Sequence, residues 1–197
     1  MARPGRLAEW LGVAAPTVTV SLQRLARDGW VSVAPDRSVE LTAPGGQAAA
    51  AIVRRHRILE RWLTDVLGLD WAAADREAQS LAHGMSDLVL DRLDGLLGHP
   101  ATCPHGNVIP GRRPPAGRPL VRLVDLEPGQ RAPVARISEV AEHEAPQLLA
   151  VLGELAIRPG AVVEAGAPHD GGHGVLIDER EAVLDDAVAR AVWVQQP

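Results

Sequence analysis

The clearest amphipathic pattern in the chain lies between residues 14 and 30. Pro16 marks a helix start, because the missing N–H of proline costs nothing in the first turn, and Gly29 marks the stop. Apolar residues at i, i+4 and i+7 predict one buried stripe, formed by Val18, Leu22 and Leu25. A second face with similar spacing is hydroxylic and basic and carries Thr17, Ser21 and Arg24.

The flanking residues extend this helix into a DNA-binding pattern. Residues 6–11 predict a second helix, and residues 12–15 form a turn short enough to hold the two helices at a sharp angle. Residues 30–34 and 39–42 alternate like strands around a turn at 35–38, so a hairpin follows and completes a winged helix. We expect DNA contacts at Pro16, Thr17, Thr19, Ser21, Arg24, Arg37 and Ser38. For any single one of them, the alternative is an ordinary solvated position.

The remaining pattern predicts a helical segment and then a small β domain, so the fold is mainly α with β. A long helix begins near Gly46 and ends near Gly68, a second lies within residues 70–87, and a leucine-rich third follows. Strands are expected at 120–126, 132–138, 161–167, 174–178 and 189–194, and a helix at 147–155. The predicted domains are 1–44, 45–110 and 120–197, with a Pro/Gly/Arg-rich linker at 111–119.

Composition narrows the class of protein. No apolar run is long enough to span a membrane, and the first residues lack the apolar centre of a signal peptide. The single cysteine excludes an internal disulfide and fits a reducing cytoplasm. The net charge is −5, but residues 1–62 carry nine arginines against five acidic residues, whereas residues 63–197 carry eleven against twenty. The basic end is therefore the end with the DNA-binding pattern.

Two helices carry candidate metal ligands. His56 and Glu60 are separated by one helical turn and share a face, so they can bind one divalent ion or form an ordinary salt bridge. Asp75, Gln79 and His83 follow one another at the same spacing. Further along, Cys103 and His105 are too few for a zinc site, and no orienting residue or oxyanion motif supports a hydrolytic dyad.

Several motifs in order resemble the diphtheria-toxin-repressor family of iron- and manganese-dependent transcriptional regulators: LAEWLGVAAPTVTVSLQRLARDGWV, DRSVELTAPG, RRHRILERWLTDVLGLD, EAQSLAHGMSD and CPHGNVIPG. The resemblance covers nearly the whole chain. It implies a winged-helix domain, a helical metal-binding and dimerisation domain, and a C-terminal SH3-like small β-barrel. It also implies Fe²⁺ or Mn²⁺ as cofactor and a homodimer on a palindromic double-stranded DNA operator. The dimer would form through the helix bearing Leu88, Leu90, Leu93, Leu96 and Leu97.

The same resemblance assigns roles to individual residues. His56 and Glu60 match ancillary metal ligands, Asp75 stands where a histidine is often found, and Glu144 and Gln147 have the spacing of ligands from the C-terminal domain. His83 and Gln79 match positions of the primary metal site. Gln79 replaces Cys or Glu and Ala82 replaces Glu, so the primary site lacks its anionic ligands. Positions where some members bind an anion are occupied by Arg57, Cys103 and Asn107.

Family members carry a further helix before the segment that begins here at Ala2, and that helix supplies a metal ligand. Either the start of this chain is assigned too late, or the helix is trimmed off, or the protein lacks it. We favour a start assigned too late, because without such a helix the apolar sides of Leu7, Trp10 and Leu11 would be partly uncovered.

The sequence therefore predicts a cytoplasmic, homodimeric, metal-dependent repressor of metal-homeostasis genes, with no membrane, small-molecule substrate or catalysis. One alternative is a winged-helix regulator that has lost metal control, which Gln79 and Ala82 motivate. The other is an enzyme, for instance a hydrolase that uses Cys103 and His105.

Overall fold

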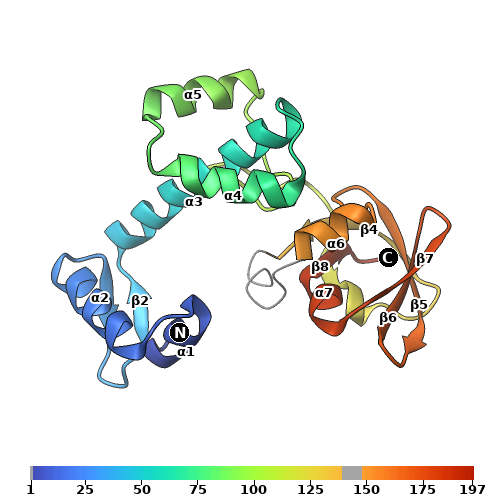
Figure 1. Ribbon diagram of the computed structural model, residues 1–197, viewed down its shortest axis with the longest axis horizontal. Coiled ribbons are helices and arrows are strands. Elements are labelled where there is room, and N and C mark those ends of the chain that lie inside the picture. Colours follow the sequence, from blue (N-terminus) through green and yellow to red (C-terminus); the bar gives the residue numbers. More distant parts are fainter. Residues whose placement is uncertain (1, 139–147) are drawn as a thin grey trace. The chain divides into compact units, whose positions relative to one another are not determined.

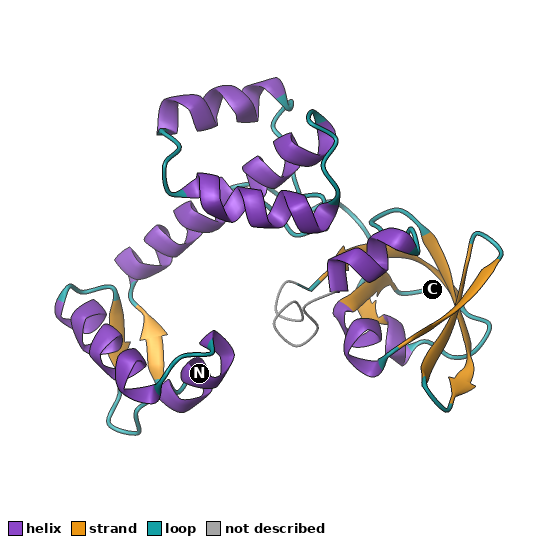
Figure 2. Ribbon diagram, viewed as in Figure 1, coloured by secondary structure: helices purple, strands orange, loops and turns teal. Residues whose placement is uncertain are grey.

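The computed structural model describes residues 2–138 and 148–197 (Figure 1). It divides into two compact units, and the boundary falls between Val53 and Arg54, inside a continuous helix. Figure 2 shows helices in both units, with strands in a short hairpin of the first unit and in the C-terminal half of the second.

The first unit is a winged helix. Helices α1 (Pro4–Leu11) and α2 (Ala15–Arg27) precede an antiparallel hairpin of β1 (Val31–Val33) and β2 (Val39–Leu41). Each three-residue strand buries only its first side chain, so the core is small and consists of Ala8, Val18, Leu22, Val31 and Val39. The sequence predicts that Val18, Leu22 and Leu25 form the buried stripe of α2. Leu25 does not belong to it, because its side chain is 37% exposed.

Helix α3 (Ala43–Asp65) begins three residues before the predicted start near Gly46. Pro44 lies in the first turn of this helix, where proline is tolerated. The Thr42 hydroxyl accepts a hydrogen bond from the Gly45 amide at 3.1 Å. The same hydroxyl donates to the Gly29 carbonyl at 2.6 Å. A side chain at Gly45 would lie 1.8 Å from the Trp30 carbonyl oxygen, so glycine allows the helix to start against the wing.

In the second unit, the C-terminal part of α3 packs with α4 (Trp71–Ala82) and α5 (Asp87–Leu96). The Asp70 side chain accepts from the Ala73 amide and the Ser86 hydroxyl accepts from the Val89 amide, so each helix begins with an N-cap. The shared core of these helices consists of Ile58, Leu59, Leu63, Ala74, Ala78, Leu90 and Ile109.

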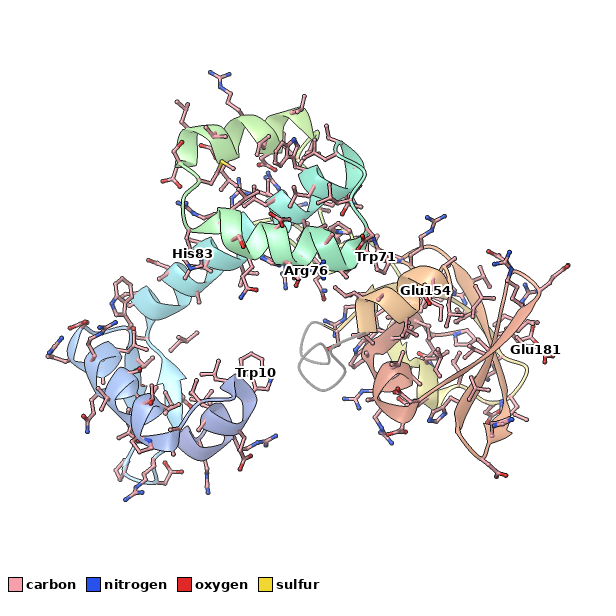
Figure 3. All side chains as sticks on the ribbon, viewed as in Figure 1. Trp10, Trp71, Arg76, His83, Glu154 and Glu181 are labelled. Carbon is pink, nitrogen blue, oxygen red and sulfur yellow. The ribbon has the colours of Figure 1, made fainter. Side chains whose placement is uncertain are left out.

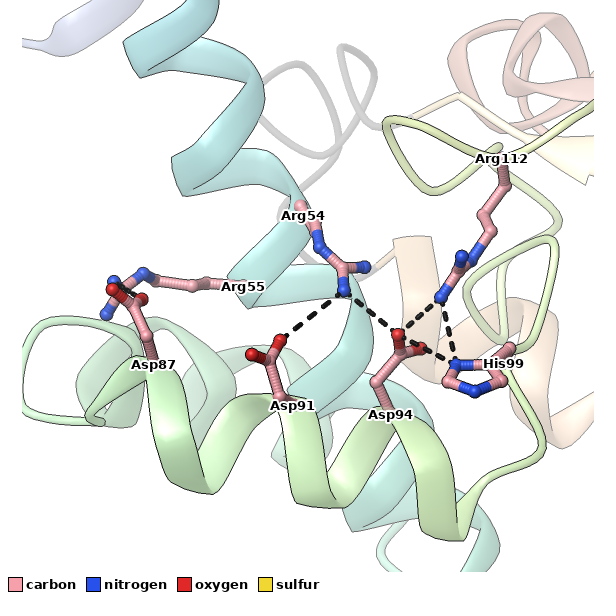
Figure 4. A network of polar contacts seen from close by, with 7 residues as sticks. All are labelled: Arg54, Arg55, Asp87, Asp91, Asp94, His99 and Arg112. Atoms are coloured by element: carbon pink, nitrogen blue, oxygen red, sulfur yellow. Dashed lines mark hydrogen bonds and ion pairs between the residues drawn. The ribbon is translucent and has the colours of Figure 1, made fainter.

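A polar network fastens α5 to α3. Asp94 of α5 is 2% exposed and accepts a hydrogen bond from Arg54 of α3 at 2.9 Å (Figure 4). Arg112 donates to the same carboxylate oxygen, and His99 lies 3.1 Å from it. Two cations thus neutralise one buried carboxylate.

The C-terminal domain is a small antiparallel β-barrel in which six strands pair in the order β3-β8-β4-β5-β6-β7. Its elements are β3 (Leu120–Arg122), 3₁₀ helix η1 (Leu123–Asp125), β4 (Arg131–Ile137), α6 (Leu148–Glu154), β5 (Val162–His169), β6 (Gly172–Ile177), β7 (Arg180–Leu184), α7 (Asp186–Ala191) and β8 (Val192–Gln195).

Three details of this domain differ from the sequence prediction. Residues 123–125 form a 3₁₀ turn instead of strand, and strand β7 was not predicted. The last predicted strand begins too early, because residues 189–191 belong to α7. The Asp185 side chain accepts a hydrogen bond from the Val188 amide at 2.8 Å and so starts that helix.

Candidate metal centre and DNA-binding surface

Helix α3 carries both core residues and candidate ligands along the same stretch. Ile58 and Leu59 are fully buried, and Glu60 beside them is 1% exposed. His56 lies one turn before Glu60, and its Nε2 is 3.4 Å from Glu60 Oε1. Burial of a carboxylate in this position requires a neutralising partner.

Helix α4 supplies the next candidate ligand. Asp75 Oδ1 lies 3.1 Å from His56 Nε2. The candidate ligand atoms of His56, Glu60 and Asp75, hereafter the helix set, all lie within 4.8 Å of one another. The structure thus brings together three residues from two helices that the sequence singled out as ligands.

The donor chemistry of the helix set fits a divalent ion. Burial opposes ionisation of Glu60, but hydrogen bonds from His105 and His56 outweigh it and lower the pKa of its carboxyl to about 2. Burial also opposes the charged form of His56, yet hydrogen bonds to Asp75 and Glu60 raise the pKa of its imidazole to about 10. Positive charge is therefore favoured between the Glu60 and Asp75 carboxylates. It can be supplied by a proton on His56 or by a metal ion that replaces this proton. Glu60 Oε2 is buried with no hydrogen-bond partner among the described residues, which leaves this oxygen available to such an ion.

A second set of candidate ligands shares Glu60. The turn after α5 brings His105 Nδ1 to 3.1 Å from Glu60 Oε1, and the Cys103 side chain completes a group whose ligand atoms lie within 4.8 Å of one another. We call Glu60, Cys103 and His105 the turn set. Sequence reasoning missed it, because only two of its members are close in the chain and the third comes from α3. The Cys-x-His spacing was the one available signal.

The turn that carries Cys103 and His105 is attached to the barrel. The Ile137 amide of β4 donates to the His105 carbonyl at 2.8 Å, and the Asn107 side chain donates to the Ile137 carbonyl at 2.8 Å. Gly106 allows this approach, because a side chain there would lie 2.2 Å from the Ala135 carbonyl oxygen. The Trp71 and His105 rings pack in a T-shaped arrangement at a centroid distance of 4.9 Å.

The other predicted metal residues lie elsewhere. His83 and Trp71 lie at opposite ends of α4 (Figure 3), and both His83 and Gln79 are exposed. Among residues 2–138 and 148–197, groups of three or more His, Cys, Asp or Glu side chains that could hold a metal ion form only around Glu60, so His83 belongs to no such group. Glu144 and Gln147 lie outside the described residues.

The residues predicted to bind an anion are engaged with the protein backbone. Arg57 donates a hydrogen bond to the Val108 carbonyl, and Asn107 donates to Ile137 as described above. Cys103 is 1% exposed. The side chains of Arg57 and Asn107 thus hold the turn after α5 in place. Anion binding by Arg57, Cys103 and Asn107 stays a prediction.

The polar face of α2 is open. Pro16, Thr17, Thr19, Ser21 and Arg24 are all exposed, whereas Val18 and Leu22 between them are buried. The Thr19 hydroxyl donates to the Ala15 carbonyl of its own helix at 3.0 Å. An exposed face of this kind, on the second helix of a helix-turn-helix, has the shape and the donors needed to enter a major groove.

At the wing, the structure separates two residues that the sequence grouped together. Arg37 is exposed at the tip. Ser38 is 4% exposed, and its hydroxyl donates to Asp36 Oδ1 at 2.7 Å. The Ser38 hydroxyl thus closes the turn of the wing, and a phosphate contact from Ser38 stays a prediction.

Helix α5 buries one side and exposes the other. Leu90 is 5% exposed, and Leu93 and Leu97 pack against the same core. Leu88 and Leu96 are each 69% exposed. An apolar surface of this kind on one helix is typical of an association surface. Within the described part of the chain, no helix is long and apolar enough to cross a membrane.

Comparison with family models covers almost the whole chain. Residues 1–39 match the iron dependent repressor N-terminal DNA binding domain, and residues 42–111 match the iron dependent repressor metal binding and dimerisation domain. Residues 121–196 match the FeoA domain.

Named relatives agree with these models. The iron-dependent repressor IdeR of Mycobacterium tuberculosis is 37% identical over 202 residues, which cover 97% of this chain and 87% of that protein. The diphtheria toxin repressor of Corynebacterium diphtheriae is 34% identical over 199 residues, with 97% and 87% covered.

Solved structures share the fold as well. A manganese-dependent transcriptional repressor in complex with manganese superposes with a TM-score of 0.83 at 35% identity, covering 98% of this chain and 90% of that one. The IdeR of T. acidophilum superposes with a TM-score of 0.76 at 26% identity, covering 100% and 90%.

Proposed function

Because the chain belongs to the iron-dependent repressor family, we propose that it is a metal-dependent transcriptional repressor that binds double-stranded DNA as a homodimer. The observation that carries this proposal is the helix set, which places three metal-binding side chains on α3 and α4. Helix α3 begins in the winged-helix unit and ends beside these ligands. The relatives are repressors and not enzymes, and no catalytic residue is assigned.

DNA recognition is assigned to the exposed face of α2. Thr17, Ser21 and Arg24 offer hydroxyl and guanidinium donors to base edges and phosphates, and Arg37 offers a phosphate contact from the wing. One winged helix makes few phosphate contacts, so a homodimer is needed for tight binding. We infer that the operator is palindromic, with half-sites about one DNA turn apart, and that the protein acts in the cytoplasm on metal-homeostasis genes.

His56, Glu60 and Asp75 would hold Fe²⁺ or Mn²⁺, and we propose Glu144 and Gln147 as further oxygen ligands. A bound ion would supply positive charge between the two carboxylates in place of the His56 proton. Since His56 and Glu60 lie on α3 and Asp75 on α4, ligation fixes these two helices in one arrangement. Operator affinity then rises by the free-energy difference that metal makes between the arrangements.

The test is operator binding measured by fluorescence anisotropy, using DNA from the promoter upstream of the gene for this protein. Anaerobic protein is titrated onto the DNA with Mn²⁺, with Fe²⁺ and with chelator. We expect binding with metal and weak binding in chelator. If the folded protein binds the DNA neither with Mn²⁺, nor with Fe²⁺, nor with chelator, the assignment as a repressor would be contradicted.

The alternative is a winged-helix regulator without metal control. The exposed Gln79 and the neutral Ala82 favour it, because both stand where the family resemblance calls for anionic ligands. Equal operator affinity with metal and with chelator would support this alternative.

A further inference from the structure

The turn set is a buried group of three side chains with different donor atoms. Glu60, Cys103 and His105 are each 1% exposed, and they come from α3 and from the turn after α5. Their potential ligand atoms, one oxygen, one sulfur and one nitrogen, lie within 4.8 Å of one another. A metal ion is a common reason for these three residue types to meet away from water.

We propose that the turn set binds a thiophilic divalent ion such as Zn²⁺ or Co²⁺, through Cys103 Sγ, a ring nitrogen of His105 and a carboxylate oxygen of Glu60. The helix set offers only nitrogen and oxygen and suits Mn²⁺ or Fe²⁺, whereas a thiolate shifts the preference toward softer metals. The inference deepens the proposed function, since it adds a class of metal to which the repressor responds.

Glu60 has the chemistry to serve this set in addition to the helix set. His56 and His105 both approach its Oε1, at 3.4 Å and 3.1 Å. Its Oε2 is buried with no hydrogen-bond partner among the described residues. A carboxylate has two oxygens with about four lone-pair sites, so Glu60 can bind a second ion or bridge two of them.

The turn is preorganised for ligation. The Gly106 amide donates to the Cys103 carbonyl at 3.0 Å, which closes a tight turn with the two ligands at its first and third positions. The same turn is attached to Ile137 of β4 through His105 and Asn107. An ion held by the turn set would therefore join α3 to the barrel domain through a short and rigid path.

The competing interpretation is a buried thiol next to a Glu60–His105 ion pair, with no metal affinity. The chain offers a direct way to separate the two, because Cys103 is its single cysteine. Any absorption band from thiolate-to-cobalt charge transfer must arise from this residue.

The experiment is an anaerobic titration of the reduced full-length protein with Co²⁺, followed by ultraviolet and visible absorption. We expect a charge-transfer band that saturates and that added Zn²⁺ removes. Cys103→Ser should abolish the band. His105→Phe should lower the Co²⁺ affinity of the thiolate site by roughly tenfold or more while the circular dichroism spectrum is unchanged. Asp75→Asn, which alters only the helix set, should keep the band.

Visible cobalt absorption without a charge-transfer band in the folded wild-type protein would overturn the proposal, as would a band that His105→Phe leaves unaltered in strength and affinity. The readout needs no DNA, so it fails separately from the proposed function. A cobalt–thiolate band together with metal-independent operator binding would support the turn set and contradict the repressor mechanism. If no cobalt–thiolate band appears but operator binding depends on metal, the turn set would be contradicted and the repressor mechanism supported.

Discussion

Glu60 is the residue on which the metal chemistry depends most, because it belongs to both ligand sets. Its burial could not be predicted from sequence, since a carboxylate one turn from a histidine is equally typical of an exposed salt bridge. The His56–Glu60 pair itself could be predicted, because one helix fixes its spacing. His105 could not be placed beside Glu60, because their contact depends on how the turn after α5 packs on the barrel.

Removing the charge of Glu60 should weaken metal binding in both sets. We expect Glu60→Gln to lower Mn²⁺ affinity by roughly 100-fold, since an amide oxygen carries no net charge to compensate the ion. Competition with a chelating dye measures this. The matched control is Glu77→Gln, an exposed position on α4 that should leave the affinity unchanged. Equal affinities in wild type and Glu60→Gln would refute the assignment of Glu60 as a ligand.

Asp94 should contribute to stability instead of metal binding. Burial raises the pKa of its carboxyl, but hydrogen bonds from Arg54, His99 and Arg112 lower this pKa by more than burial raises it. The pKa of Asp94 therefore lies below its ordinary value. We expect Asp94→Asn to lower the free energy of unfolding by about 1–3 kcal/mol at neutral pH. Denaturant unfolding, with and without the substitution, measures this difference.

The sign of the pH dependence follows from the lowered pKa. A carboxyl whose pKa is depressed on folding stabilises the protein above its unfolded pKa of about 4 and loses that effect as pH falls through the folded value. The difference in the free energy of unfolding between wild type and Asp94→Asn should therefore shrink below about pH 4. Asp91→Asn, on the same helix but 73% exposed, should change stability by less than about 0.5 kcal/mol at any pH. A gap that stays constant with pH would contradict this view of Asp94.

At the scale of elements, local patterns predicted most helices and failed where short segments depend on tertiary contacts. The N-cap at Asp185 starts a six-residue helix whose second half overlaps the predicted strand 189–194, and β7 has mixed charged and apolar residues that do not alternate. Strand β7 exists because β6 offers an edge for it to pair with. Ser38 illustrates the same limit, since only the folded wing shows that its hydroxyl is turned to Asp36.

Helix α2 should recognise DNA through its exposed face. We expect Arg24→Ala to lower operator affinity about tenfold and to reduce the salt dependence of binding by about one charge. Arg158→Ala removes the same charge from an exposed position in the barrel domain and should change neither quantity. Anisotropy titrations at several salt concentrations measure both. Equal effects of the two substitutions would show that only overall charge matters.

Helix α5 should carry the dimer contact. Leu96 is 69% exposed, and we expect Leu96→Glu to convert the dimer to a monomer with little change in the unfolding midpoint, because its side chain is outside the core. Analytical ultracentrifugation measures the change in mass. Val183→Glu, also at an exposed apolar position but on β7, should stay dimeric. If Leu96→Glu remains a dimer, the contact lies elsewhere.

For the whole molecule, the central claim is that metal held by the helix set controls DNA binding. The decisive quantity is the ratio of operator affinities with Mn²⁺ and with chelator, measured side by side in wild type and in His56→Ala. We expect a ratio well above one in wild type and close to one in His56→Ala, with equal affinities for both proteins in chelator. A ratio that His56→Ala leaves unchanged would contradict control through His56, Glu60 and Asp75.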